Sequence, residues 1–141
     1  MELRTFAEQI LFSDTLDAKI SAPISICDSS PGLPISSPIT PHRPSFLRFK
    51  SSESTAAAPP NASDLSQDQA RGHLLHYFAN HELLATELMA LVLLRFPDAP
   101  SDFRQGVYRT LLDEQDHTRL YLARMKTCGV AFGDLPVSGF F

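Results

Sequence analysis

The stretch that decides the fold reads GHLLHYFANHELLATELMALVLLRF over residues 72–96 and SDFRQGVYRTLLDEQDHTRLYLARMKTC over residues 101–128. The four residues between them, Pro97-Asp98-Ala99-Pro100, force a turn because proline cannot continue a helix. Two helices of about 25 to 30 residues joined by so short a turn must lie antiparallel. The sequence therefore predicts an all-α fold built on a helical hairpin.

The ends of the two helices carry their own signals. Gly129 suits the left-handed residue that often ends a helix, so the second helix is expected to stop near Cys128. Side chains that cap helices precede both segments: Asn61, Ser63 or Asp64 before the first, and Ser101 or Asp102 before the second. We therefore expect the hairpin to begin near Asp64 and, with its tail, to form the unit 64–141.

Three side chains of metal-ligand type interrupt otherwise apolar seams of the two helices. Steps of four and three residues along the first helix give an apolar seam with Glu82 in its middle. The same steps along the second helix bring Glu114 and His117 onto one face. Glu82 and Glu114 are both 16 residues from Asp98 at the centre of the turn. The two carboxylates are therefore predicted to point inward and to face each other at one level.

Two inward carboxylates at one level call for a cation, because an unpaired buried carboxylate is costly or takes up a proton. Iron or manganese bound by a Glu and a Glu-x-x-His pair is the arrangement of di-metal carboxylate bundles. We predict that Glu82, Glu114 and His117 are metal ligands, with iron as the cofactor of a di-iron site and manganese as its alternative. The competing interpretation is a rim where Glu82 pairs with an arginine and the other two side chains are solvated.

Neighbouring polar residues are candidates for accessory roles. His81 adjoins Glu82 but points about 100° away from it. Glu87 is the fallback carboxylate, although it lies about 7.5 Å off the level of Glu114. Asp113 is a candidate to orient a ligand histidine of a facing helix, with surface solvation as its alternative. A second stripe, for which a solvent face or an interface is favoured over a ligand set, consists of His73, His76, Asn80 and Glu87.

The first 63 residues divide by composition. Thr5 to Lys19 mix apolar and acidic residues, and Thr5 with Glu8 reads as a capping box, so a short amphipathic helix is predicted within residues 1–20. Eight of the 11 prolines lie between Ser21 and Pro60, which excludes a regular helix or a central strand there. Scattered apolar residues predict an extended arm laid over a folded body, followed by a flexible stretch over residues 51–62. The arm and linker form the unit 21–63.

Composition excludes several classes of protein. A net charge of -4, with no dense basic cluster, leaves binding to nucleic acid or to an anionic membrane unsupported. The longest apolar run, Leu88 to Leu94, is far shorter than the roughly 20 residues of a membrane-spanning helix. The N-terminus lacks a secretory signal, and Cys27 and Cys128 make no disulfide framework. The expected protein is soluble and intracellular, cytoplasmic by default with an organelle left open.

Some longer segments resemble a known family. They are His81-Glu82-Leu83, Glu87-Leu88-Met89, Phe96-Pro97-Asp98-Ala99-Pro100, Asp113-Glu114-Gln115-Asp116-His117-Thr118-Arg119-Leu120-Tyr121 and, nearer the ends, Leu3-Arg4-Thr5-Phe6-Ala7-Glu8 and Phe132-Gly133-Asp134-Leu135-Pro136-Val137. Together they resemble an uncharacterised ferritin-like family, of the type termed domain of unknown function 455. The resemblance implies a ferritin-like bundle with a di-iron centre, and relatives that include oxygen-activating hydroxylases of the tRNA-modifying type. It also implies that this chain holds only the N-terminal half, because family members continue into a second hairpin.

These observations support two functions of different classes. The leading hypothesis is a di-iron carboxylate protein of oxidoreductase type, with one half-site per chain completed in a homodimer. The alternative is a truncated, non-enzymatic helical hairpin that acts as an interaction module for another helical partner. An RNA-modifying hydroxylase rests on analogy alone and is disfavoured by the acidic charge.

Overall fold

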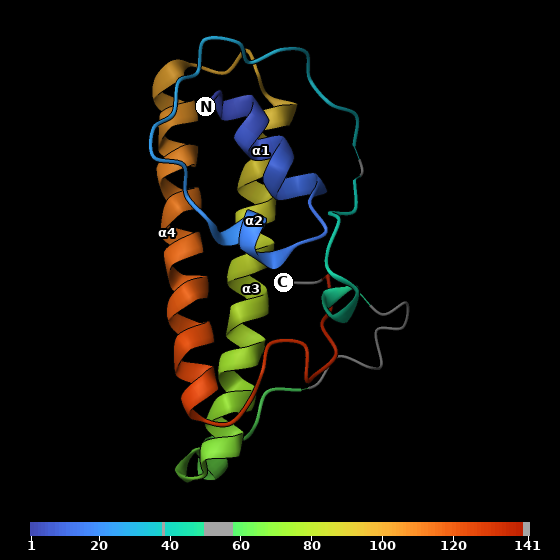
Figure 1. Ribbon diagram of the computed structural model, residues 1–141, viewed down its shortest axis with the longest axis vertical. Coiled ribbons are helices and arrows are strands. Elements are labelled where there is room, and N and C mark those ends of the chain that lie inside the picture. The colour runs from blue at the N-terminus through green and yellow to red at the C-terminus, as the bar shows by residue number, and fades with distance from the viewer. Residues whose placement is uncertain (38, 50–57, 140–141) are drawn as a thin grey trace.

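Two long antiparallel helices form the body of the protein. The computed structural model describes residues 1–37, 39–49 and 58–139. Its α-helices in these ranges are α1 (Leu3–Phe12), α2 (Leu16–Ile20), α3 (Asp68–Arg95) and α4 (Ser101–Thr127). α3 and α4 pack along their whole lengths, and α1 and α2 lie across one side of the pair (Figure 1). Among the described residues no strand occurs, so the predicted all-α class and the antiparallel hairpin are confirmed.

The N-terminal segment is two helices where the sequence predicted one. α1 buries Leu3, Phe6 and Ile10 against α3 and α4, as its amphipathic pattern requires. The helix ends after Phe12, where the Ser13 hydroxyl accepts the backbone N–H of Thr15 at 3.1 Å. Such local bonding competes with helix continuation, so α2 begins anew at Leu16. The predicted capping box is also wrong, because α1 begins at Leu3 and the residue before it, Glu2, holds the cap position.

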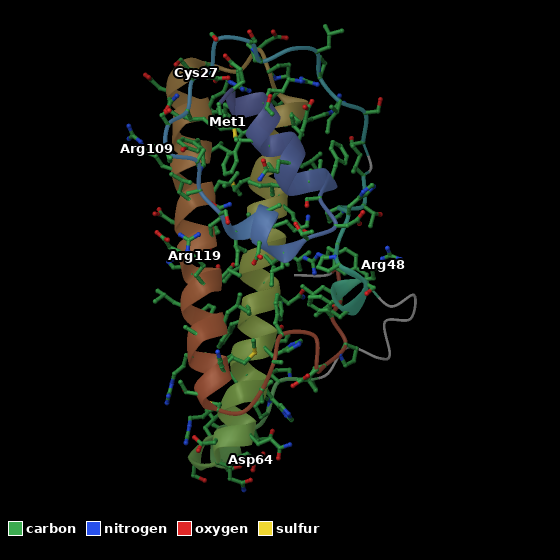
Figure 2. All side chains as sticks on the ribbon, in the orientation of Figure 1. Met1, Cys27, Arg48, Asp64, Arg109 and Arg119 are labelled. Carbon is green, nitrogen blue, oxygen red and sulfur yellow. The ribbon has the colours of Figure 1, made fainter. Side chains whose placement is uncertain are left out.

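The proline-rich arm lies over the folded body, as predicted. Residues 21–44 contain no described helix, yet Ile26, Ile35 and Ile39 pack against the core formed by α1, α3 and α4. The buried guanidinium of Arg104 binds the carboxylate of Asp28 at 2.7 and 2.8 Å and also donates to carbonyl groups at the end of α3. The arm is thereby tied to the turn end of the hairpin, where Figure 2 shows Met1 beside Cys27.

The arm ends in a short 3-10 helix, η1 (Ser45–Leu47), and a second one, η3 (Ala62–Ser66), precedes α3. Most of the stretch predicted to be flexible, residues 50–57, lies outside the described residues. Because η3 takes up the residues expected to cap the first long helix, α3 begins only at Asp68, after Gln67. α4 begins at Ser101, so the predicted caps Ser101 and Asp102 lie inside the helix and Pro100 holds the cap position. Gly129 has a φ of 74°, which confirms its left-handed stop.

Three of the four residues of the second polar stripe of α3 are buried within this chain, which corrects the expectation of a solvent face or an interface with another hairpin. His76, Asn80 and Glu87 are 2%, 5% and 3% exposed. They are covered by the arm and by residues 130–138, which return from α4 along α3 (Figure 1). The burial is tolerated because each polar group has partners within the chain.

Within the described residues, no helix has an apolar stretch long enough to cross a lipid bilayer.

Candidate metal centre

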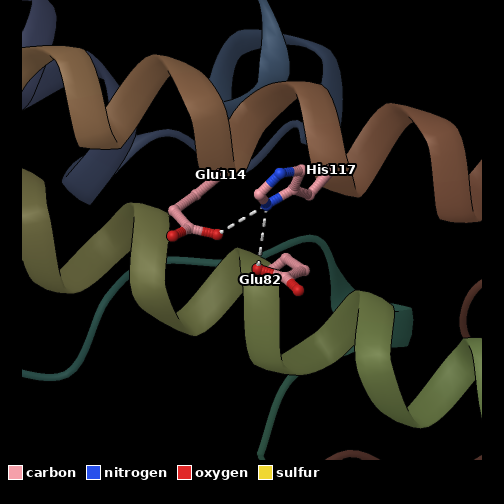
Figure 3. A group of neighbouring side chains, drawn as sticks. All are labelled: Glu82, Glu114 and His117. Carbon is pink, nitrogen blue, oxygen red and sulfur yellow. Dashed lines mark hydrogen bonds and ion pairs between the residues drawn. The ribbon is translucent and has the colours of Figure 1, made fainter.

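Glu82 on α3 and Glu114 and His117 on α4 come together at one level of the hairpin, as predicted (Figure 3). The Nδ1 atom of His117 lies 3.2 Å from Oε2 of Glu114 and 3.7 Å from Oε2 of Glu82. One potential ligand atom from each of the three residues lies within 4.8 Å of the others. The two glutamates, which are equally distant from the turn, therefore lie opposite each other. Glu82 faces Glu114 and His117, whereas the competing interpretation expected it to pair with an arginine.

The cluster lies on the face of the hairpin that the other described residues of the chain leave open (Figure 3). The side chains of Glu82 and Glu114 are 21% and 20% exposed, and that of His117 is 51% exposed. Figure 3 shows the three side chains in front of α3 and α4, with α1 and α2 behind. The seams expected to point inward are therefore only partly buried, since Met125 is 1% exposed whereas Phe78 and Phe103 are 39% and 51% exposed. The chain buries the opposite side of the hairpin because α1, α2 and the arm pack there.

The surroundings of Glu82 and His117 favour the protonated form of each side chain. Partial burial, with the hydrogen bond and the charge of Glu114 adding to it, raises the pKa of Glu82 from 4.5 to about 7. The hydrogen bond to Glu114 raises the pKa of His117 above its ordinary value, in spite of desolvation. Both pKa shifts indicate that the site favours added positive charge. A bound metal ion would bring such a charge in place of the protons.

We expect the substitution Glu82→Gln to stabilise the metal-free protein at alkaline pH. The raised pKa of Glu82 means that the folded state gains stability from the bound proton below pH 4.5 and loses it as the pH rises through about 7. At about pH 8 the variant should therefore have a free energy of unfolding roughly 1 to 3 kcal/mol above that of the wild type. Near pH 5 the two proteins should differ little.

Urea unfolding of chelator-treated protein at the two pH values measures this difference. Glu8→Gln is the matched control, since Glu8 forms a partly exposed pair with Arg4 and its removal should have a small effect at both pH values. A Glu82→Gln protein that is less stable than the wild type at pH 8 contradicts the raised pKa of Glu82.

The accessory candidates lie elsewhere. His81 packs against Tyr77, with 4.3 Å between ring centroids. Glu87 faces the other way on α3 and is bound by Arg43 and Lys19, so its oxygens are occupied. Asp113 is exposed, and its charge contributes to the raised pKa of His117. The structure therefore brings together the three primary candidates and leaves the accessory ones outside the cluster.

Two buried threonines support the glutamates and escaped sequence reasoning. Thr86 and Thr118 are both 0% exposed. Each donates its hydroxyl to the carbonyl of the glutamate four residues earlier, Thr86 to Glu82 at 2.9 Å and Thr118 to Glu114 at 2.8 Å. Such bonds adjust the local helix backbone. The repeated Glu-x-x-x-Thr spacing on both helices was the signal that could have identified them.

Comparison with known proteins places the chain in a family and assigns it no activity. No curated protein and no solved structure matches the chain. A family model described as a protein of unknown function (DUF455) matches residues 4–141, which is nearly the whole chain. The match includes the hairpin, the arm and all three residues of the cluster. The chain therefore belongs to this family of proteins of unknown function, DUF455.

Proposed function

We propose that this protein binds iron, or manganese in its place, through Glu82, Glu114 and His117, and that two chains join their open faces to form one di-iron carboxylate centre of oxidoreductase type. The observation that carries the proposal is the cluster itself, in which two carboxylate oxygens and one imidazole nitrogen lie within 4.8 Å of one another. These are donor atoms that first-row divalent metals accept.

The geometry fits a metal ion after small side-chain rotations. Ligand atoms bound at about 2.1 Å to one ion lie no more than about 4.2 Å apart. Nδ1 of His117 already lies within that distance of one oxygen of each glutamate, at 3.2 Å from Glu114 and 3.7 Å from Glu82. A bound ion would take the place of the protons that the site favours on Glu82 and His117. Iron in such a centre supplies one-electron and oxygen chemistry. The chain's own residues neutralise the ion's charge and fix its position at the open face.

The open face supports completion of the centre by a second copy. Di-metal bundles take a Glu from each of two helices and a Glu-x-x-His pair from each of two others, and one chain supplies one of each. On the same hairpin Phe78, Phe96 and Phe103 remain 39%, 55% and 51% exposed. α3 carries apolar residues around nearly its whole circumference, which is typical of a helix buried on all sides. Two hairpins related by a two-fold axis would form a ferritin-like bundle that covers these rings.

Reconstitution of the purified chain with ferrous iron, followed by exposure to air, tests the proposal. We expect a dimer that holds about one iron ion per chain, measured by native mass spectrometry and elemental analysis. A monomer that holds iron would refute the dimer but not the assignment of the metal ligands. A chain that binds neither iron nor manganese refutes the metal centre.

A pair of variants tests whether the dimer forms through the open face, without changing the metal ligands. Phe78→Asp places a charge on the open face beside Tyr121, with which Phe78 makes a ring contact at 6.0 Å, and should convert the dimer to a monomer. Ile24→Asp is the matched control, because Ile24 on the arm is fully exposed and should tolerate the charge. If both variants stay dimeric, the two chains do not join through this face.

A second candidate function is an interaction module for another helical protein. It is favoured by the same exposed phenylalanines, which would bind a partner helix without any metal. In this case the chain would remain a metal-free monomer until the partner is added. The reconstitution experiment distinguishes the two candidates, since only the first predicts iron and dimer together.

A further inference from the structure

A buried histidine holds the segment that returns from α4 along α3. We call residues 130–138 the C-terminal strap. His76 of α3 is 2% exposed, and its Nε2 atom accepts the backbone N–H groups of Gly133 at 3.0 Å and Leu135 at 3.4 Å. The ring also meets Phe132 edge to face, with 5.2 Å between centroids. One imidazole thus contacts the strap through two hydrogen bonds and one aromatic contact.

The direction of these hydrogen bonds fixes the protonation state of His76. Both bonds end on the same nitrogen as acceptor, so Nε2 carries no proton and the neutral ring has its hydrogen on Nδ1. A proton on Nε2 would point at two N–H donors and remove both bonds at once. A cavity of about 30 Å³, lined by residues that include His73, His76 and Tyr77, lies beside the ring, which is room for about one water molecule.

The charged groups around His76 do not compensate for a second proton on the ring. Burial lowers the pKa of His76 below its ordinary value of 6.5, Asp134 of the strap opposes this, and His73 on α3 adds to it. Asp134 is itself engaged, since its carboxylate accepts the N–H of Ala131 at 2.8 Å. Further along α3, the charge of Arg43 is taken up by Glu87 and by the amide oxygen of Asn80. The ring therefore stays neutral at neutral pH.

The strap also closes part of the apolar core. Val137 is 5% exposed and packs with Leu47 of η1 and Leu83 of α3. The carbonyl of Ser138 accepts the side-chain N–H of Asn80 at 3.0 Å. Release of the strap would therefore expose Leu83 and Leu47 together, while α3 and α4 keep their own contact.

We propose that His76 is a pH-sensitive latch, whose protonation releases the C-terminal strap and exposes the apolar surface beneath it. A histidine that is neutral in the folded state contributes stability above its unfolded pKa, and this contribution is lost as the pH falls through the lower folded value. The latch therefore holds at neutral pH and opens in mild acid. The inference is independent of metal binding, because His76 faces away from the Glu82 cluster.

Amide hydrogen exchange read by NMR on the full chain tests the latch. Between about pH 7.5 and about pH 5, the protection factors of the Gly133 and Leu135 amides should fall by up to about tenfold per pH unit once His76 begins to take up a proton. Amides in the middle of α4 should keep theirs.

Two variants and one direct measurement decide the outcome. His76→Gln keeps an acceptor near the Nε2 position without a titratable group and should abolish the pH dependence, whereas His73→Gln should retain it. If His76→Gln does not fold, the ring nitrogens of the wild type still report the tautomer. A proton on Nε2 at neutral pH, or a pH dependence that survives in the His76→Gln protein, overturns the proposal.

Discussion

Replacing Glu87 by alanine is expected to lower the free energy of unfolding by about 3 to 5 kcal/mol, because it leaves two buried cations without their shared anion. The carboxylate binds Arg43 through three contacts of 2.6 to 3.1 Å and Lys19 at 3.0 Å. Lys19 and Arg43 are 0% and 2% exposed. Denaturant unfolding at neutral pH measures the loss.

The cluster around Glu87 contains two cations and one carboxylate, so the loss of stability should depend on which of these residues is replaced. Burial, opposed by the charge of Glu87, lowers the pKa of Lys19, so Lys19 is the cation that sheds its charge most easily. Lys19→Met should therefore cost less stability than Glu87→Ala. Glu8→Ala is the matched control for the glutamate, since its pair with Arg4 is partly exposed and its loss should cost no more than about 0.5 kcal/mol. Equal losses for Glu87→Ala and Glu8→Ala contradict the role assigned to the buried cluster.

Replacing Glu114 by alanine is expected to reduce the affinity for manganese(II) or iron(II) by more than about 100-fold, a larger loss than removal of an outer-shell partner causes. Glu114 contributes one of the three ligand atoms and also holds Nδ1 of His117 at 3.2 Å. The substitution therefore removes one ligand and frees the orientation of a second. A manganese titration followed by electron paramagnetic resonance measures the affinity.

The control for this variant must remove a charge near the site without removing a ligand. Asp116→Ala meets the requirement, because Asp116 is exposed on the same helix and pairs with Arg119. Its effect on manganese affinity should stay within a few-fold, in line with the weak influence of exposed charges. If both variants weaken binding equally, the metal is attracted by the general acidity of α4 and is not coordinated by Glu114.

The hairpin and its cluster could be predicted because they depend on features close together in the sequence. Pro97 and Pro100 fixed the turn, and helical periodicity fixed the face on which each ligand lies. A short turn leaves almost no freedom of register, so residues equally distant from it must meet. For this reason the sequence alone predicts that Glu82, Glu114 and His117 lie together.

Periodicity failed where a helix is apolar on nearly every side. Along α3 both the seam with Phe78 and Glu82 and the stripe with His76 and Glu87 have helical spacing, so the pattern could not tell which of them the chain buries. The structure buries the second, because Arg43 and Lys19 neutralise Glu87. Those contacts join residues 44 or more positions apart, and a proline-rich arm has no period from which to infer them.

The sequence by itself determined the helical hairpin, its register and the meeting of one carboxylate with a Glu-x-x-His pair, since all three depend on local geometry. Only the tertiary structure decided which face of the hairpin stays open and which is sealed by the arm and the strap. The physical reason is that burial of a polar stripe depends on partners supplied from distant parts of the chain. In this protein Arg43 and the strap supply them, which leaves the candidate ligands on the open face.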